Sequence, residues 1–160
     1  MKKILVPTDG SECSNLAIDQ AKEIALKFDS EVVLLHVTDA SAAYTLFNPV
    51  HDGMNPTAGS VAPAGHMAVP LPAEHQKILD KASKDILASA KARLIVLGDK
   101  VTTHSMEGKP ADIIIDYVEN NDIDLVVMGS HGMSGFKRFF VGSITHKVML
   151  SIEQPILIVR

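Results

Sequence analysis

A glycine-rich segment near the C-terminus is the feature whose residue types point most directly to chemistry. It reads Gly129-Ser130-His131-Gly132-Met133-Ser134-Gly135, and after residues 136–141 the chain continues with Gly142-Ser143. Glycines let backbone N–H groups approach phosphate oxygens without interference from a Cβ atom. The N-terminus of a following helix adds free N–H groups and a partial positive charge. We therefore expect a phosphate-binding loop, with Ser143 capping the helix and donating its hydroxyl group to a phosphate.

This segment differs from two better-known phosphate-binding patterns. No Gly-Lys-Ser/Thr follows at the spacing of a Walker P-loop, and the glycines do not have the GxGxxG spacing of dinucleotide-binding proteins. Lys137 and Arg138 either pair with phosphate charge or are solvated cations of the loop. His131 lies in the loop by position, and it either donates to a phosphate or faces solvent.

The remaining histidines and the cysteine form no comparable pattern. His51, His66 and His75 lack the short spacing of metal ligands, so a metal site would require them to meet in the fold. We expect no metal site from them. His36 lies in a predicted buried strand, and we interpret it as a hydrogen-bonded core residue. No base is identifiable beside Cys13, so we expect no nucleophilic role for it.

Short apolar runs define the strands that must position the loop. Residues 4–6, 32–37, 125–128 and 156–159 are rich in β-branched and apolar side chains. Because these runs are continuous rather than alternating, they are typical of strands buried on both faces of a parallel sheet.

Two helices are predicted from apolar residues that recur at a period of 3.6. The first follows possible caps at Ser11 and Ser14, and the second begins at Pro110, where the missing N–H costs nothing. Their apolar faces comprise Ala17, Ala21, Ile24, Ala25 and Phe28 in the first helix, and Ile113, Ile114, Tyr117 and Val118 in the second.

Residues 94–97 allow two interpretations. Read alone they look like a strand, but they also continue a helical stripe of apolar residues that begins at Leu79. Gly98 then stands where a glycine often ends a helix. We predict a helix over 73–97 and a strand over 101–106.

The resulting order of elements predicts one α/β domain with a doubly wound, five-stranded parallel sheet. In such sheets ligands bind at the carboxyl ends of the strands, where the strand order reverses. This rule directs attention to residues 7–10, 36–38 and 129 onward.

Length, net charge and cysteine content exclude several classes of protein. A chain of 160 residues fits a single domain, 1–160, and its net charge of −4 disfavours nucleic acid and anionic membranes as partners. One cysteine excludes a disulfide framework, and we expect a cytoplasmic protein. Residues 39–72 hold five of the eight prolines and three of the ten glycines, and we interpret them as a long insert. The insert is a lid, a partner surface or a mobile loop.

The sequence resembles the universal stress protein family. Gly129-x2-Gly132-x9-Gly142-Ser143 matches the ATP-binding motif G-2x-G-9x-G-(S/T) of that family. Further similarity covers residues 4–11, 34–37, 107–110, 124–129 and 154–159. The resemblance implies the adenine nucleotide alpha hydrolase-like fold and a homodimer formed through the C-terminal strand 155–159.

The resemblance also implies a site for an adenine nucleotide. Pro7, Thr8 and Asp9 would lie beside the adenine and ribose, with Asp9 accepting from a ribose hydroxyl group. Val37 would offer its backbone to the adenine edge, and Gly108 would let the chain pass close to the adenine. The other implied contacts are Met128 and Gly129 at the ribose, and Ser130, His131, Gly132, Gly142, Ser143 and Ile144 around the phosphates.

We therefore expect an ATP-binding regulatory protein of the stress response. Mg²⁺ would be held mainly by the phosphates, and ADP or AMP are alternative ligands. Two other functions remain open at this point. One is slow ATP hydrolysis on the same fold, and the other is a dimeric scaffold whose nucleotide site is vestigial.

Overall fold

The computed structural model describes residues 1–39, 72–132 and 141–160. Most of the predicted insert therefore lies outside the described residues, together with His51 and His66. The same is true of the loop segment 133–140, which contains Lys137 and Arg138.

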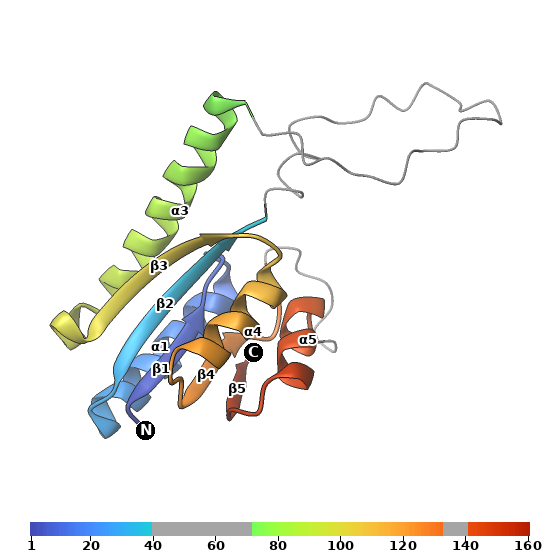
Figure 1. The fold of residues 1–160 in the computed structure, drawn as a ribbon. Helices are drawn as coiled ribbons and strands as arrows, with labels where there is room; N and C mark the ends of the chain where they lie inside the picture. The colour runs from blue at the N-terminus through green and yellow to red at the C-terminus, as the bar shows by residue number, and fades with distance from the viewer. Residues whose placement is uncertain (40–71, 133–140) are drawn as a thin grey trace, which may run out of the picture.

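Five parallel strands form one sheet in the order β3-β2-β1-β4-β5 (Figure 1). This confirms the predicted doubly wound α/β fold. The strands are β1 (Lys3–Pro7), β2 (Glu31–Thr38), β3 (Val101–Glu107), β4 (Leu125–Gly129) and β5 (Ile156–Val159). Because the chain runs outward from β1 to β3 and then returns to β4, the strand order reverses between β1 and β4. The carboxyl ends of these two strands therefore border the crevice where ligands bind in this class of sheet.

Helices cover both faces of the sheet. In Figure 1, α4 and α5 lie in front of it and α1 lies behind, while α3 runs along the β3 edge. Their bounds are α1 (Glu12–Phe28), α3 (Ala73–Arg93), α4 (Pro110–Asn120) and α5 (Ser143–Ser151). Successive strand residues alternate between two cores. Ile4 and Leu34 belong to the core with α1 and α3, whereas Leu5 and Leu35 belong to the core with α4 and α5. Both faces being buried explains the continuous apolar runs.

The predicted end of the long helix is wrong. Helix α3 ends at Arg93, and a 3₁₀ segment, η1 (Ile95–Lys100), leads into β3. The Leu97 N–H donates to the Leu94 carbonyl at 2.9 Å, an i to i−3 bond. Both leucines are buried, so the apolar stripe continues although the α-helix has stopped. Gly98 (φ 57°, ψ −126°) lies inside η1 and does not follow the α-helix as a cap.

The structure also tests three predictions made for residues at helix ends. Ser11 caps α1, because its Oγ accepts from the Ser14 N–H at 3.2 Å. Phe28 is not part of the buried face, because it is the last residue of α1 and is 58% exposed. The cap of α5 is Gly142, and Ser143 is the first helical residue with no capping role.

The amino ends of β1 and β4 are joined by a carboxylate. Asp124 accepts hydrogen bonds from the N–H groups of Lys2 and Lys3 at 2.5 Å and 2.9 Å. These two bonds hold the pKa of Asp124 below its ordinary value.

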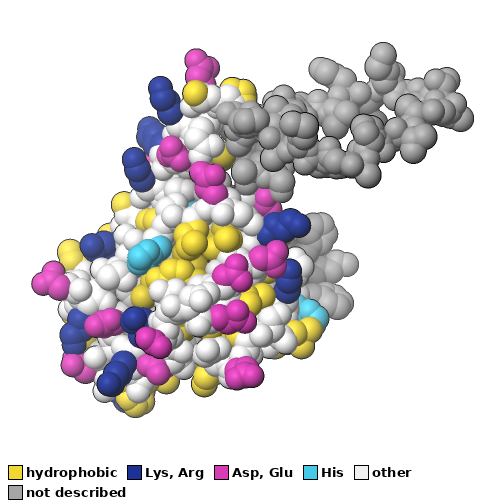
Figure 2. Space-filling view, viewed as in Figure 1, with side chains coloured by type: hydrophobic (Ala, Val, Ile, Leu, Met, Phe, Trp, Pro, Cys, Tyr) yellow, Lys and Arg dark blue, Asp and Glu magenta, His cyan; other side chains and the backbone are white. Residues whose placement is uncertain are grey.

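The surface carries interspersed acidic and basic side chains, and apolar side chains gather where β3 and α4 meet (Figure 2). Within residues 1–39, 72–132 and 141–160, no helix is long and apolar enough to cross a bilayer.

Candidate functional site

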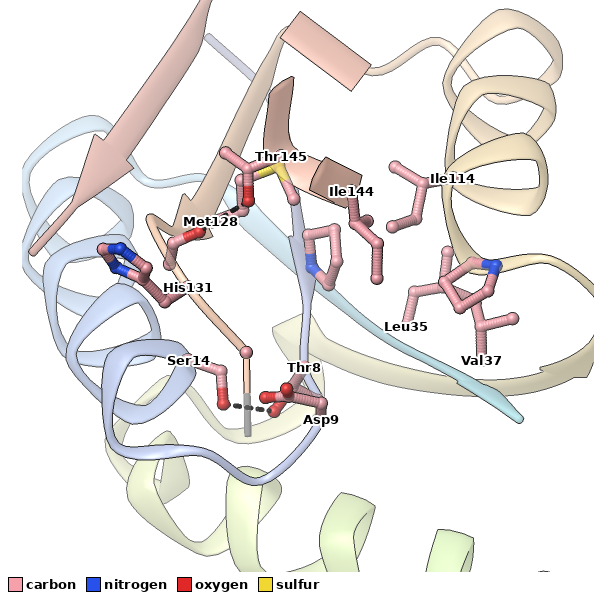
Figure 3. Close-up of a pocket in the computed structure, with 14 residues that line it drawn as sticks. Thr8, Asp9, Ser14, Leu35, Val37, Ile114, Met128, His131, Ile144 and Thr145 are labelled. Carbon is pink, nitrogen blue, oxygen red and sulfur yellow. Dashed lines mark hydrogen bonds between the residues drawn. The ribbon is translucent and has the colours of Figure 1, made fainter. Parts of the chain in front are cut away.

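A pocket opens at the carboxyl ends of β1, β2 and β4 (Figure 3). Its volume is about 110 Å³, whereas a packing defect that holds one water needs about 10–15 Å³. The opening is therefore large enough to take part of a ligand. It is lined by Pro7, Thr8, Asp9, Ser14, Leu35, Val37, Pro110, Ile114, Met128, Gly129, His131, Gly132, Ile144 and Thr145.

Most of the residues predicted from the sequence meet at this pocket. The exceptions among the described residues are Gly108, Ser130, Gly142 and Ser143, which do not line it. Gly108 instead forms the turn from β3 into α4, at a φ of 145° that favours glycine. Its N–H donates to the Thr38 carbonyl at 3.0 Å, and an added Cβ would lie 2.9 Å from the Ile113 side chain.

Sheet order divides the lining into two sides, with β1 between them. We call Leu35, Val37, Pro110 and Ile114 the β2 side of the pocket. Met128, Gly129, His131, Gly132, Ile144 and Thr145 form the β4 side. The β2 side consists of apolar side chains from β2 and α4, and Figure 3 shows Leu35, Val37 and Ile114 gathered together.

Hydrogen bonds fix the turn that follows β1. The buried Thr8 hydroxyl group donates to Ser14 Oγ at 3.2 Å, and Ser14 Oγ donates to the Ser11 carbonyl at 2.9 Å. Asp9 Oδ1 accepts from the Ser11 N–H at 3.0 Å. The Asp9 carboxylate is therefore held at the mouth of the pocket by the start of α1.

The backbone of Val37 lies beyond the end of β1 and faces the position that a longer β1 would occupy. Pro7 pairs with Leu35, and the last bond of this ladder runs from the Thr8 N–H to the Leu35 carbonyl at 2.9 Å. Successive residues of a parallel strand turn their polar groups to alternate neighbours, so the next residue of β2 that faces β1 is Val37. Among the described residues, no backbone hydrogen bond joins Val37 to Thr8. One N–H group and one C=O group are thus directed toward the pocket.

Close approaches of the backbone shape the β4 side. A Cβ added at Gly129 would lie 2.8 Å from the Cys13 carbonyl carbon, and one at Gly132 would lie 2.6 Å from Asp9 Oδ2. The buried Thr145 hydroxyl group donates to the Gly129 carbonyl at 2.9 Å. This bond fixes the first turn of α5 to the end of β4.

Two amides of the predicted phosphate loop are already engaged within the chain. The Ser130 N–H donates to the Val159 carbonyl, and the Gly142 N–H donates to the Ser130 carbonyl, both at 2.7 Å. By contrast, the first hydrogen bond inside α5 runs from the His146 N–H to the Gly142 carbonyl. The amides of residues 143–145 precede it and have no acceptor within the helix.

A histidine completes the β4 side. Nδ1 of His131 lies 2.8 Å from Ser130 Oγ, so one of these two atoms donates to the other. Nε2 of His131 is buried and has no hydrogen-bond partner among the residues that the structure describes. Within the same residues, no group of three His, Cys, Asp or Glu side chains could hold a metal ion.

The sequence analysis missed five residues of the lining as site residues, namely Ser14, Leu35, Pro110, Ile114 and Thr145. A signal existed for two of them. Leu35 shares a strand face with Val37 because the two residues are two apart, and Ile114 lies one helical turn after Pro110. Thr145 carries no such signal, because its position depends on where α5 begins.

Comparison with known proteins identifies the family of this chain. A model of the universal stress protein family matches residues 1–160. The chain is 32% identical to universal stress protein MJ0531 of Methanocaldococcus jannaschii over 159 residues, which cover 99% of this chain and 82% of that protein. It is 31% identical to universal stress protein YxiE of Bacillus subtilis over 163 residues, covering 99% of this chain and 98% of that protein.

Solved structures share the fold. The structure of hypothetical protein MJ0577 is 27% identical, with a TM-score of 0.73, 99% of this chain covered and 94% of that one. Two more distant universal stress proteins were solved in complex with cAMP (TM-score 0.63, 20% identical, 99% and 96% covered) and, from Archaeoglobus fulgidus, with dAMP (TM-score 0.63, 18% identical, 100% and 98% covered). The family model matches residues 1–160, and two relatives are more than 30% identical to the chain. This chain therefore belongs to the universal stress protein family.

Proposed function

We propose that this protein binds an adenine nucleotide, ATP in the first place, and acts as a nucleotide-dependent regulatory module. The observation that carries the proposal is the backbone of Val37, whose N–H and C=O groups face the pocket where β1 has ended. Adenine carries an acceptor, N1, beside a donor, the N6 amino group. A strand residue that offers one donor and one acceptor complements this edge, and the apolar β2 side would enclose the two faces of the ring.

The residues after β1 are suited to the ribose. Asp9 lines the pocket between its two sides, and its carboxylate would accept a hydrogen bond from a ribose hydroxyl group. Met128 and Gly129, at the end of β4, would lie against the sugar from the other side.

The start of α5 is suited to the phosphates. The amides of Ser143 and Ile144 have no acceptor inside the helix, and the helix dipole adds a partial positive charge there. We assign phosphate binding to these two amides and to Gly132. Ser130 and Gly142 would instead shape the loop, because their amides bond within the chain. Mg²⁺ would be held mainly by the phosphates, and ADP or AMP would occupy the same pocket.

The relatives support an adenine nucleotide over other ligands. Two proteins of the same fold were solved with cAMP and with dAMP, which share an adenine base and a single phosphate group. In a protein of net charge −4 an anion must be bound by local groups rather than by overall charge, and the start of α5 supplies N–H groups for this.

Isothermal titration with MgATP tests this function. We expect saturable binding at a protein concentration of about 100 µM, which detects dissociation constants into the high micromolar range. GTP should bind more weakly, because guanine places its donor and acceptor in the opposite order. The absence of heat with any adenine nucleotide would contradict the proposal.

Slow ATP hydrolysis is the second candidate, and one observation favours it. His131 lines the pocket, and its Nε2 is buried without a partner among the described residues, so a turn of the ring into the pocket would let it orient a water molecule. Single-turnover measurements with wild-type protein and with His131→Gln separate the two functions. ATP bound without turnover supports the regulatory module, whereas turnover that depends on His131 supports the hydrolase.

We further propose that β5 forms a homodimer interface. It is the strand at the end of the sheet, beside β4, and its other edge pairs with no strand among the described residues. Leu157 of this strand is 36% exposed. An exposed strand edge recruits a second strand. Leu157→Lys should give a monomer by light scattering, whereas Leu150→Lys, at a residue of α5 that is 70% exposed, should leave the dimer intact. A dimer that survives Leu157→Lys would rule this interface out.

A further inference from the structure

We propose that His36 keeps the Val37 amide available for the nucleobase by holding the carbonyl group that would otherwise accept from it. This inference deepens the proposed nucleotide function and rests on it. It assigns a positioning role to a side chain that does not line the pocket.

The ladder between β1 and β2 ends at Thr8. The Thr8 N–H donates to the Leu35 carbonyl, so a ladder continued by one step would bring the Val37 N–H to the Thr8 carbonyl. The structure shows a different bond at this carbonyl. His36 Nδ1 lies 2.8 Å from the Thr8 oxygen. Because a carbonyl oxygen only accepts, Nδ1 carries the hydrogen and donates it.

The two donors approach Thr8 differently, because the Val37 N–H lies in the plane of the sheet whereas the His36 side chain lies on one of its faces. Val37 belongs to the core on the α4 and α5 side of the sheet, and Leu34, on the α1 and α3 side, shares its face with His36. His36 therefore binds the Thr8 carbonyl from the side of the sheet that faces away from the pocket. The Val37 N–H stays in the plane of the sheet and is directed to the place where β1 has ended and the adenine edge would lie.

The bond is well placed to be stable. His36 is partly buried at the carboxyl end of β2, and the Thr8 side chain is itself fixed by Ser14. A single bond of this kind contributes enough to change a binding constant by about three- to tenfold. A carbonyl oxygen has two lone pairs, so the bond from His36 acts by holding the Thr8 carbonyl out of line with the Val37 N–H. Without it, the carbonyl would turn toward Val37 and accept from it, and a nucleobase would have to break that bond first.

Two substitutions of nearly equal shape test the inference. His36→Asn keeps an N–H donor two bonds from Cβ, as Nδ1 is, whereas His36→Leu has the same branching without a donor. We expect His36→Leu to bind ATP about three- to tenfold more weakly while inorganic tripolyphosphate binding is unchanged. His36→Asn should resemble the wild type in both measurements.

Amide hydrogen exchange of Val37, measured by NMR without nucleotide, reads the proposed competition directly. We expect fast exchange in the wild type and in His36→Asn, and protection in His36→Leu, where Val37 bonds to Thr8. Equal exchange in the wild type and His36→Leu would overturn the inference, and so would equal loss of ATP affinity in the two variants. If wild-type protein binds no nucleotide while the exchange pattern holds, the proposed function fails and the competition for the Thr8 carbonyl stands.

Discussion

The β2 side and the β4 side of the pocket are built by different means. The β2 side combines apolar side chains with the backbone of a regular strand whose neighbour has ended. The β4 side depends on glycines that allow close backbone approaches and on hydrogen bonds such as that from Thr145 to Gly129. Side chains can therefore vary at the β2 side with a graded effect, whereas a single added Cβ is enough to distort the β4 side.

Gly132→Val should break the β4 side and have the largest effect. An added Cβ would lie 2.6 Å from Asp9 Oδ2, so the Asp9 carboxylate must turn away from the position in which it would accept from a ribose hydroxyl group. We expect affinity for MgATP to fall more than about 100-fold, or about 2.7 kcal/mol, by isothermal titration. Ala88→Val is the control, because Ala88 is exposed on α3 and lies outside the pocket. If Gly132→Val and the wild type bind MgATP equally well, the β4 side tolerates an added side chain and the contrast with the β2 side is wrong.

Thr145→Val tests how much the bond between α5 and β4 stabilises the β4 side. Valine keeps the shape but leaves the buried Gly129 carbonyl without its donor. We expect the free energy of unfolding to fall by about 1–3 kcal/mol in urea denaturation. Thr102→Val, at an exposed position of β3, should change it by less than about 0.5 kcal/mol. If both variants lose the same amount, the Thr145 bond has no special role.

Ile114→Val makes the matching small change on the β2 side. Ile114 is 3% exposed and lines the pocket, so removing one methylene group costs about 0.5–1.5 kcal/mol of stability. Adenosine affinity should fall by less than about tenfold, because the Val37 backbone stays in place. Ile78→Val, at a residue of α3 that is 54% exposed, is the control for stability. A loss of affinity as large as that of Gly132→Val would show that the β2 side is equally intolerant.

Asp124→Asn should have the smallest effect and should not distinguish the two sides, because Asp124 joins the amino ends of β1 and β4. The N–H groups of Lys2 and Lys3 lower its pKa in the folded protein. The stability it contributes is therefore present above the unfolded pKa of about 3.9 and is lost as the pH falls through the folded value. The acid-induced decrease in unfolding free energy should be smaller in Asp124→Asn than in the wild type, and Asp116→Asn is the control. An unchanged pH dependence would contradict this role.

Much of the fold could be predicted because its signals are local. Continuous apolar runs such as 32–37 identify strands buried on both faces, and Pro110 marks the start of α4. The end of α3 could not be predicted in this way. A 3₁₀ turn and an α-helix bury nearly the same residues over so short a stretch, so Leu94 and Leu97 give the same apolar stripe in both cases.

Sequence reasoning could group residues that line the pocket, but it could not predict the hydrogen bonds around it. Thr8, Asp9, Val37 and Gly132 meet at one pocket, as the sequence motifs indicate. That Ser130 gives its amide to Val159 depends on the pairing of β4 with β5, whose partner residues are 30 positions apart in the sequence. The availability of the Val37 amide depends in turn on where β1 ends, which no residue type states.

The bond from the Ser130 amide to the Val159 carbonyl connects the β4 side of the pocket to the end of β5. If β5 is the dimer interface, occupancy of the pocket and association of two chains act on the same hydrogen bond. Thermodynamic linkage is then reciprocal: a nucleotide that tightens the dimer by some factor must bind the dimer more tightly than the monomer by that factor. The affinity for the nucleotide would then also depend on the concentration of the protein.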